Sequence, residues 1–343
     1  MKTKIKHCWL LCLLAFCSCS SWIDIKPSDR LSEGMLFEDR QGFEKAINGV
    51  YVGLTDRALY GRTLSAGIID FMAQYYTYGS GSDMNSMVGA YRYEEDEIKA
   101  IFQSAWEKAY ALIVNCNIII EKCDAKREVL SDVYYGLYKG EAIALRAMLH
   151  LDMLRLFGPV YDDASKTEKS IPYVTNSDSE ISPLLSAEEI LNFVIEDLKV
   201  ALDLLKSVDP ILTEGVRNES NNDGGDNSLY YRQYRMNYYA VKALLARAYA
   251  WGHDGRNALI VAEEILREVQ VEGAEIFPFV EHSAAVDPSV PDRVFSTEVI
   301  FSLYDSYRGT EIQDKLFIPT VDQIYTFMKR NPAILSRSLA IAL

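Results

Sequence analysis

The sequence predicts a mostly α-helical fold, built from helix pairs that are joined by long loops and a few short strands. Residues 141–161 are apolar on nearly every side of a helix and end at Gly158-Pro159, a pair that stops helices. Residues 186–205 repeat apolar side chains at three- and four-residue steps. Residues 238–268 hold two such segments around a tight turn. One helical hairpin cannot bury its own face, so several pairs should stack.

The N-terminal segment predicts an export signal. Lysines at positions 2, 4 and 6 precede the apolar run 8–16, which is too short to span a membrane. The run ends in Cys17-Ser18-Cys19, which resembles a bacterial lipobox, although Phe16 stands where Leu is usual. We predict that Cys19 is lipidated after residues 1–18 are removed; Cys17 as the acceptor, or an ordinary cleaved signal, are the alternatives. Such a lipid attaches a protein to a membrane without a spanning helix.

Length and charge limit the number of domains and the classes of partner that we expect. The 343 residues suffice for one large domain or two ordinary ones, and we expect a single helical domain over 19–343. Its parts are an N-terminal part 19–97, a helical-repeat part 98–270 and a C-terminal part 271–343. The net charge of −14, with no basic patch, repels phosphate backbones, so nucleic acid is not an expected partner.

Cysteine usage predicts neither a disulfide-built nor a metal-built domain. Four of the six cysteines lie within the first 19 residues. The other two, Cys116 and Cys123, are seven residues apart on one predicted helix, hence about 10 Å apart and beyond disulfide reach. We expect both to be buried free thiols.

In the first half of the chain, residues 39–56 predict an amphipathic helix and residues 64–72 one or two helical turns. The rest of 60–95 has the composition of a loop. Helices then follow over 98–123 and from 128 into the central helix. The polar connection 161–185 contains a short extended piece at 171–174.

In the second half, Ser186 and Glu189 form a capping box that starts the helix 186–205. Asn237 can cap the helix 238–251, which pairs with 256–268. We expect Ala240, Leu244, Ala248 and Trp251 to face Ala258, Ala262, Ile265 and Leu266. Residues 298–304 predict a strand, and the chain from 309 onward is weakly patterned.

The loop 70–93 is the predicted ligand site. Sugars present apolar C–H faces ringed by hydroxyls, so flat aromatic side chains beside hydrogen-bonding groups suit them. Tyrosine outnumbers phenylalanine, 22 to 13, and this loop is rich in it. The candidate ligand-binding residues are Asp70, Gln74, Tyr75, Tyr76, Tyr78, Tyr91 and Arg92, with Asn85 beside them; Tyr304 and Tyr307 are weaker candidates. Each tyrosine could equally pack against the scaffold.

No catalytic, cofactor or metal motif is present in the sequence. His150 lies inside the central helix, where a packed core residue is the expected role. Asn221, Asp223 and Asp226 do not have the spacing of an EF-hand loop, so we expect no metal there. Paired carboxylates could serve a glycosidase, but with 49 acidic residues the sequence nominates no pair.

Six segments in order, 21–54, 145–161, 171–174, 186–205, 235–266 and 298–304, together with the lipobox, resemble the SusD/RagB-like outer-membrane lipoproteins. The resemblance covers about 17–305. It implies a scaffold of tetratricopeptide-like helix pairs and a lipid-anchored protein, with palmitate on the cysteine, exposed at the surface of the outer membrane. It further implies a non-enzymatic protein that binds glycans, or peptides in some members, and works with a SusC-like TonB-dependent transporter.

One feature departs from that family. Its members usually run well past 343 residues, which suggests that part 271–343 is incomplete, as a truncated product or a shortened variant. The alternative functions are a helical-repeat scaffold that binds another protein without a glycan ligand, a peptide-binding member, and, more remotely, a glycoside hydrolase.

Overall fold

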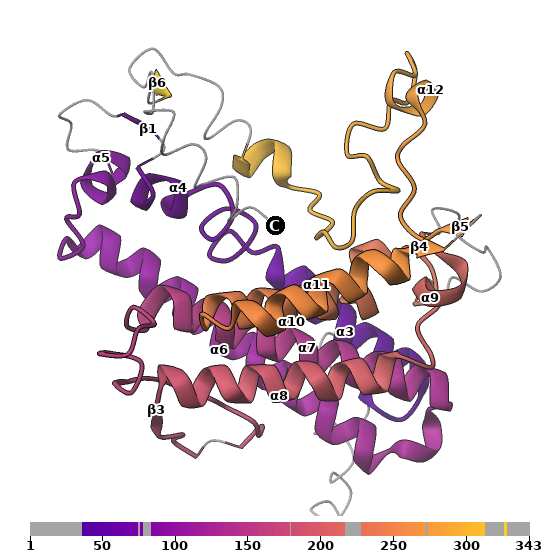
Figure 1. The fold of residues 1–343 in the computed structure, drawn as a ribbon. Coiled ribbons are helices and arrows are strands. Elements are labelled where there is room, and N and C mark those ends of the chain that lie inside the picture. Colours follow the sequence, from indigo (N-terminus) through magenta and orange to yellow (C-terminus); the bar gives the residue numbers. More distant parts are fainter. Residues whose placement is uncertain are drawn as a thin grey trace, which may run out of the picture.

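The computed structural model describes residues 36–74, 76–77, 84–178, 180–216, 228–271, 274–312 and 326–327 (Figure 1). The predicted signal segment with Cys19, and the loop around Asn221, Asp223 and Asp226, lie outside these ranges. Within them, helices dominate and no helix combines the length and apolar character needed to cross a bilayer.

Helix α7 (Asp132–Phe157) is the central element. Its N-cap Ser131 accepts a hydrogen bond from the Tyr134 N–H, and at its end the Gly158 N–H donates to the Leu154 carbonyl. Nearly every side chain between Gly136 and Leu154 is buried, because neighbouring helices cover α7 on most of its surface. Its most extensive contacts are with α6 (Asp96–Ala125) and α8 (Ala187–Leu205). The predicted central helix and its stop are confirmed.

The other long helices build outward from α7 (Figure 1). Helix α3 (Arg40–Leu54), capped by Asp39, packs on α6 and α7. Helix α10 (Tyr238–Trp251) packs on α8 and pairs with α11 (Gly255–Val269). Helix α8 therefore contacts both helix pairs, α6 with α7 and α10 with α11. This arrangement confirms the mostly α-helical prediction.

The predicted helix caps are present. The Glu189 N–H donates to Ser186 Oγ, and the Ser186 N–H donates to the Glu189 carboxylate. Asn237 accepts from the Ala240 N–H at the start of α10. One predicted contact is wrong: Leu266 is 58% exposed, because it lies about 100° around α11 from the buried Ile265.

Short elements fill the N-terminal connections. Helix α4 (Ile68–Met72) and helix α5 (Met84–Gly89) lie between α3 and α6 and pack on each other. The predicted helical turns near 64–72 correspond to α4. The loop expectation was wrong for α5, whose polar and glycine-rich sequence gives a weak helical pattern that contact with α4 and α6 overrides. The later connections contain two short helices, α9 (Ile211–Glu214) and α12 (His282–Ala285). They also contain two 3-10 turns, η1 (Arg127–Val129) and η2 (Arg232–Tyr234).

The described strands are short antiparallel pairs. Strand β2 (Lys169–Pro172) pairs with β3 (Leu184–Ser186), so the predicted extended piece is part of a small ribbon. Strand β4 (Gln270–Val271) pairs with β5 (Ala274–Glu275), and β1 (Tyr76–Thr77) pairs with β6 (Thr326–Phe327).

The predicted strand over 298–304 is wrong. This segment is irregular, and it lies along the approach to α10 through individual hydrogen bonds rather than a ladder. The Ser302 N–H donates to the Gln233 carbonyl, and Asn237 Nδ2 donates to the Ile300 carbonyl at 2.7 Å. Its β-branched and aromatic residues favour a strand only where a partner strand exists.

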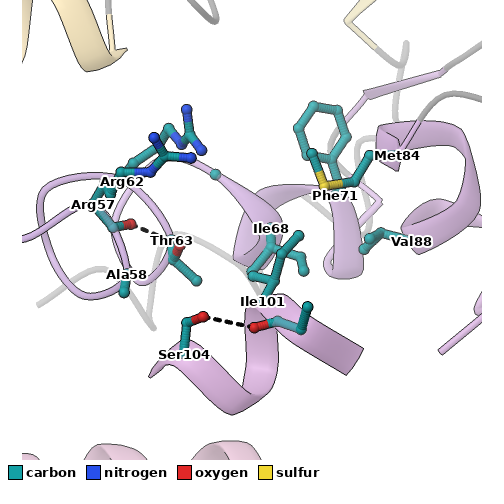
Figure 2. A pocket seen from close by; sticks show the side chains of 12 residues that line it. Arg57, Ala58, Arg62, Thr63, Ile68, Phe71, Met84, Val88, Ile101 and Ser104 are labelled. Atoms are coloured by element: carbon teal, nitrogen blue, oxygen red, sulfur yellow. Dashed lines mark hydrogen bonds between the residues drawn. The ribbon is translucent and has the colours of Figure 1, made fainter. Parts of the chain in front are cut away.

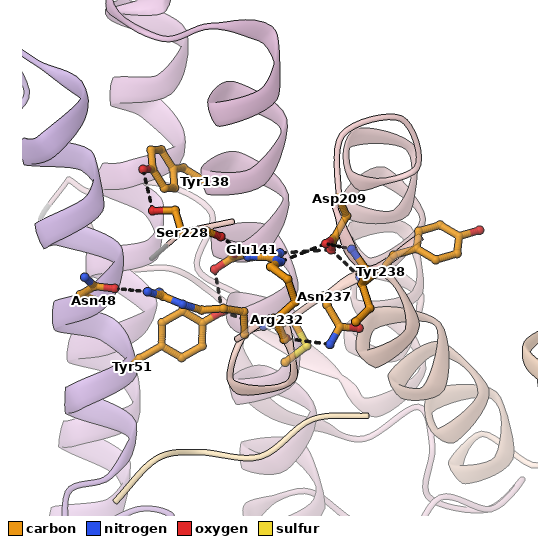
Figure 3. A network of polar contacts seen from close by, with 12 residues as sticks. Asn48, Tyr51, Tyr138, Glu141, Asp209, Ser228, Arg232, Asn237 and Tyr238 are labelled. Carbon is orange, nitrogen blue, oxygen red and sulfur yellow. Dashed lines mark hydrogen bonds and ion pairs between the residues drawn. The ribbon is translucent and has the colours of Figure 1, made fainter. Parts of the chain in front are cut away.

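A buried ion-pair network joins α3, α7 and the segment before α10 (Figure 3). Arg232, 1% exposed, donates to both oxygens of Asp209 at 2.9 and 3.1 Å and to Glu141 Oε1 at 2.6 Å. The Tyr51 hydroxyl donates to Glu141 Oε2 at 2.8 Å and accepts from the Met236 N–H at 2.7 Å. Each buried charge thus has several partners, as burial of an ion pair requires.

A second polar cluster ties α6, α7 and α8 together. Arg146 makes a two-pronged pair with Asp197 at 2.7 and 2.8 Å, and the Tyr173 hydroxyl donates to the same carboxylate. His150 Nε2 accepts from the Val174 N–H, so the proton lies on Nδ1, which faces the Arg146 carbonyl at 2.9 Å. His150 is fully buried, and burial lowers its pKa to about 3, so it is the predicted core residue.

Cys116 and Cys123 are buried and unpaired, as predicted. Burial raises the pKa of each thiol to about 12. Both sulfurs therefore stay protonated and unreactive at neutral pH, in the manner of small apolar core residues.

Candidate functional site

A pocket of about 360 Å³ opens between the turn 55–67, helices α4 and α5, and the start of α6 (Figure 2). Its volume is at the lower end of the range typical of small-molecule sites. Twelve residues line it: Arg57, Ala58, Arg62, Thr63, Gly67, Ile68, Phe71, Met84, Val88, Ala100, Ile101 and Ser104. Three of these residues, Phe71, Met84 and Val88, fall within the loop 70–93 that the sequence nominates for ligand binding.

The pocket floor belongs to a small hydrophobic cluster that is separate from the main core. Ile68 and Phe71 of α4 and Val88 of α5 are buried in it together with Ile98 at the start of α6. Met84, which is 39% exposed, and Ile101 extend the apolar surface toward the opening. A ligand in this pocket would meet C–H groups on that side.

The opposite side of the pocket is basic. In Figure 2 Arg57 and Arg62 appear on one side of the pocket, across from Phe71 and Met84. Arg62 Nη1 lies 3.5 Å from Glu311 Oε2, an ion pair without a hydrogen bond. No acidic side chain lines the pocket among the described residues.

Dense local hydrogen bonding fixes the turn that carries these arginines. Backbone N–H groups of Leu59 and Gly61 donate to the Asp56 carbonyl, and the Thr63 N–H donates to the Arg57 carbonyl. The Asp56 side chain accepts from the Ala58 N–H and pairs with Lys108 of α6 at 3.1 Å. Burial raises the pKa of Asp56, but these two partners outweigh it and the net shift is downward, so the carboxylate stays ionised and the turn stays attached to α6.

Two of the predicted site residues, Asp70 and Gln74, lie in α4 or shortly after it but do not line the pocket. Asp70 is half-buried, and burial raises the pKa of its carboxyl. Gln74 adopts a left-handed backbone conformation with φ 55°, and its Nε2 donates to the Gly89 carbonyl at 3.0 Å. Gln74 therefore joins the ends of α4 and α5, and the structure gives it a supporting role beside the pocket.

Two others lie on the turn between α5 and α6. Tyr91 is 58% exposed with φ 58°, and its ring packs edge-on against Tyr93, which in turn meets Phe102. Arg92 pairs with Glu95 on the protein surface. Tyr91 is thus a supported, solvent-facing ring near the pocket, whereas the guanidinium of Arg92 is already bound.

The remaining candidates are only partly described. Tyr75, Tyr78 and Cys19 lie outside the described residues, and of Tyr76 only the backbone pairing in β1 is described. Tyr304 is 75% exposed beside Tyr234, and Tyr307 is 70% exposed one helical turn before Glu311. Because Glu311 contacts Arg62, Tyr307 lies on a segment that approaches the pocket.

Sequence reasoning missed the residues that line the pocket. Arg57, Arg62 and Phe71 fall before or at the edge of the tyrosine-rich stretch that drew the prediction. The only available signal was two arginines around Gly61, in a chain with 49 acidic residues and a net charge of −14. The spacing of these two arginines indicates a shared pocket only when the turn between them is known to fold back on itself.

A second cavity, of about 620 Å³, lies between α8, α10 and α11. Its charged residues neutralise one another: Lys242 pairs with Glu268 at 2.6 Å and with Glu264 at 3.1 Å. Its apolar surface comes from Leu202 and Tyr238. This cavity is a polar seam between packed helices, and the pocket beside α4 is the better candidate for a ligand.

The described residues contain no group of three or more His, Cys, Asp or Glu side chains placed to hold a metal ion. The carboxylates of Glu141 and Asp209 both bind Arg232 in the core, and neither lines one of the two cavities above. The pocket can therefore hold a ligand through apolar contact and hydrogen bonds from arginine.

Comparison with known proteins adds a family likeness. A model of SusD-like proteins, described as "Starch-binding associating with outer membrane", matches residues 21–212, more than half of the chain. SusD-like protein P38 of Formosa agariphila is 26% identical over 194 residues, which make up 54% of this chain and 34% of that protein.

Solved structures agree in fold. A SusD superfamily protein of Bacteroides vulgatus is similar with a TM-score of 0.52 at 21% identity, over 68% of this chain and 48% of that one. Another, of Bacteroides thetaiotaomicron, has a TM-score of 0.55 at 20% identity, over 80% of this chain and 54% of that one. The chain thus spans about a third of the curated relative and about half of these solved structures.

Proposed function

Because the chain belongs to the SusD-like family, we propose that it is a surface lipoprotein that binds oligosaccharides and passes them to a SusC-like TonB-dependent transporter in the outer membrane. Binding is non-covalent and involves no catalysis. Cys19 carries the lipid anchor, and the turn 55–67 with α4, α5 and the start of α6 forms the binding site.

The observation that carries this proposal is the pocket itself. It places an apolar floor opposite hydrogen-bond donors, a combination that matches the two faces of a sugar ring. Its frame is rigid, because the turn is closed by its own hydrogen bonds and anchored on α6. Rigid frames reduce the entropy lost on binding. Tyr91, exposed at the edge, can extend the surface for a longer chain.

Calorimetric titration tests the binding step. The chain without residues 1–19 is titrated with neutral and acidic oligosaccharides of plant, host and microbial type, after circular dichroism has shown a cooperative helical melt. Ile101→Trp fills the pocket from α6 and should weaken binding at least about tenfold, whereas Leu259→Trp, at an exposed position on α11, should not.

The outcomes separate the alternatives. Saturable binding that Ile101→Trp removes supports the proposal. A well-folded chain that binds no glycan refutes it and favours a helical scaffold for protein or peptide partners. Release of reducing ends from a substrate would instead reveal a glycoside hydrolase. The transporter step is tested separately, by asking whether the tagged lipoprotein co-purifies with a TonB-dependent barrel from solubilised outer membranes.

A further inference from the structure

The charge inside the pocket is opposite to the charge of the molecule. The chain carries 49 acidic residues against 35 basic ones, yet the charged residues lining the pocket are Arg57 and Arg62, both basic. Each guanidinium offers several N–H donors in a plane that fits a carboxylate or sulfate. A positive pocket in a negative surface selects ligands by their charge.

The hydroxyl groups of the pocket strengthen this preference. Thr63 Oγ1 donates to the Arg57 carbonyl at 2.8 Å, and Ser104 Oγ donates to the Ala100 carbonyl at 2.7 Å, as Figure 2 shows. Both hydroxyl protons are therefore already used within the protein. Among the side chains that line the pocket, the donors left for a ligand are the N–H groups of the two arginines.

The backbone holds these two arginines at a fixed spacing. A Cβ at position 61 would lie 2.1 Å from the Thr55 carbonyl oxygen, so only glycine permits this close return of the turn. The Ser65 and Ala66 N–H groups both donate to the Arg62 carbonyl. The two guanidinium groups thus start from rigid backbone positions, and little ordering is needed when a ligand binds.

Glu311 shows what kind of group this side of the pocket accepts. Its Oε2 lies 3.5 Å from Arg62 and makes no hydrogen bond within the described part of the chain, although the atom is buried. The carboxylate therefore neutralises Arg62 poorly. Arg57 has no ion pair with any described residue. An anionic group with better geometry would outcompete Glu311.

We propose that the ligand of this pocket is an acidic oligosaccharide, whose carboxylate or sulfate group binds Arg57 and Arg62 while its sugar ring lies against Ile101 and Met84. This inference rests on the proposed glycan-binding function and names its substrate class. Uronic acids and sulfated sugars share the required chemistry, and the experiment below separates them.

The test compares three probes by calorimetry: trigalacturonate, a sulfated carrageenan tetrasaccharide and neutral maltotriose. An acidic probe should bind best, and the better of the two acidic probes identifies carboxylate or sulfate. Arg57→Gln and Arg62→Gln should each weaken that binding about tenfold. Raising NaCl from about 50 to about 500 mM should weaken it further, because screening acts on an accessible charge pair. Arg256→Gln, an exposed arginine on α11, is the charge-matched control.

Glu311→Gln provides an independent check with the opposite sign. It removes the competing carboxylate from Arg62 and should tighten binding of the acidic probe about two- to fivefold. Binding of neutral probes that equals or exceeds acidic binding, unchanged by both arginine variants, overturns the inference but leaves the proposed function intact. Absence of binding to every probe of the wider panel overturns both.

Discussion

At the scale of single residues, the Tyr51 hydroxyl holds the buried network together. It donates a hydrogen bond to the Glu141 carboxylate and accepts one from the Met236 N–H, so both of these buried polar groups have a partner. Burial, followed by the negative charge of Glu141, raises the pKa of Tyr51 well above its ordinary value, so the hydroxyl keeps its proton at neutral pH.

We therefore expect Tyr51→Phe to lower the free energy of unfolding by about 1–3 kcal/mol, because a buried carboxylate oxygen and a buried N–H lose their partner. Tyr60→Phe is the matched control. The Tyr60 hydroxyl also donates to a carboxylate, that of Asp152, at 2.7 Å, but Arg155 and Arg247 contact Asp152 as well. Urea unfolding should show the smaller loss for Tyr60→Phe, and equal losses would contradict this account.

His150 predicts how stability depends on pH. Its pKa is lowered from 6.5 to about 3 by burial, so between those values the unfolded chain binds a proton that the folded chain does not. The contribution of neutral His150 to the free energy of unfolding is complete above about pH 6.5. It is lost as the pH falls toward 3, at up to about 1.4 kcal/mol per pH unit.

Urea unfolding at pH 7, 6 and 5 would measure that slope. His150→Gln should flatten it, whatever its effect on stability at pH 7, because the titrating group is gone. His282→Gln removes an exposed histidine and is the control. A slope that persists unchanged in His150→Gln would assign the pH dependence to other groups.

At the scale of helices, α7 and α8 approach each other more closely than a side chain allows at one point. A Cβ on Gly136 would lie 2.8 Å from the Leu204 carbonyl oxygen and 2.7 Å from Val208 Cγ2. A backbone oxygen in a packed helix cannot move away at low cost. The glycine is thus required by packing and not by its backbone conformation.

Gly136→Ala should therefore destabilise the protein by about 1–3 kcal/mol, even though alanine is the better helix former. Gly49→Ala in α3 is the matched substitution, since nothing lies within 4 Å of its added Cβ, and it should stabilise by about 0.4–1 kcal/mol. Thermal melts of both variants give the comparison. Stabilisation by both would mean that α7 and α8 adjust without strain.

The sequence predicts the long helices, in which many residues repeat the same apolar pattern. It does not predict the segments whose structure depends on contacts with residues far away in the sequence. The caps at Ser186 and Asn237 and the stop at Gly158 are local, so they were predictable. Helix α5 and the irregular 298–304 segment depend on α4 and on the approach to α10, respectively. Likewise, Arg57 and Arg62 become pocket residues only through the fold of the turn between them.

At the scale of the whole molecule, the long helices share one main hydrophobic core, and the candidate site lies outside that core. The pocket sits on a small hydrophobic cluster separate from the main core. Substitutions on its rim, such as Arg57→Gln, should therefore leave the melting of α7 and α8 unchanged. Binding and stability can be tested independently in this protein, which makes negative binding results interpretable.

The membrane anchor is a prediction about the whole molecule, because it decides where the pocket is displayed. If Cys19 is the acylated residue, the protein should incorporate labelled palmitate and fractionate with the outer membrane, since several acyl chains on one residue anchor a protein stably. Cys19→Ala should lose the label and leave the membrane fraction, whereas Cys17→Ala should behave like the wild type. The reverse pattern would place the acylated residue at Cys17. Absence of label from the wild type itself would indicate an ordinary cleaved signal, and the pocket would then act away from the outer membrane.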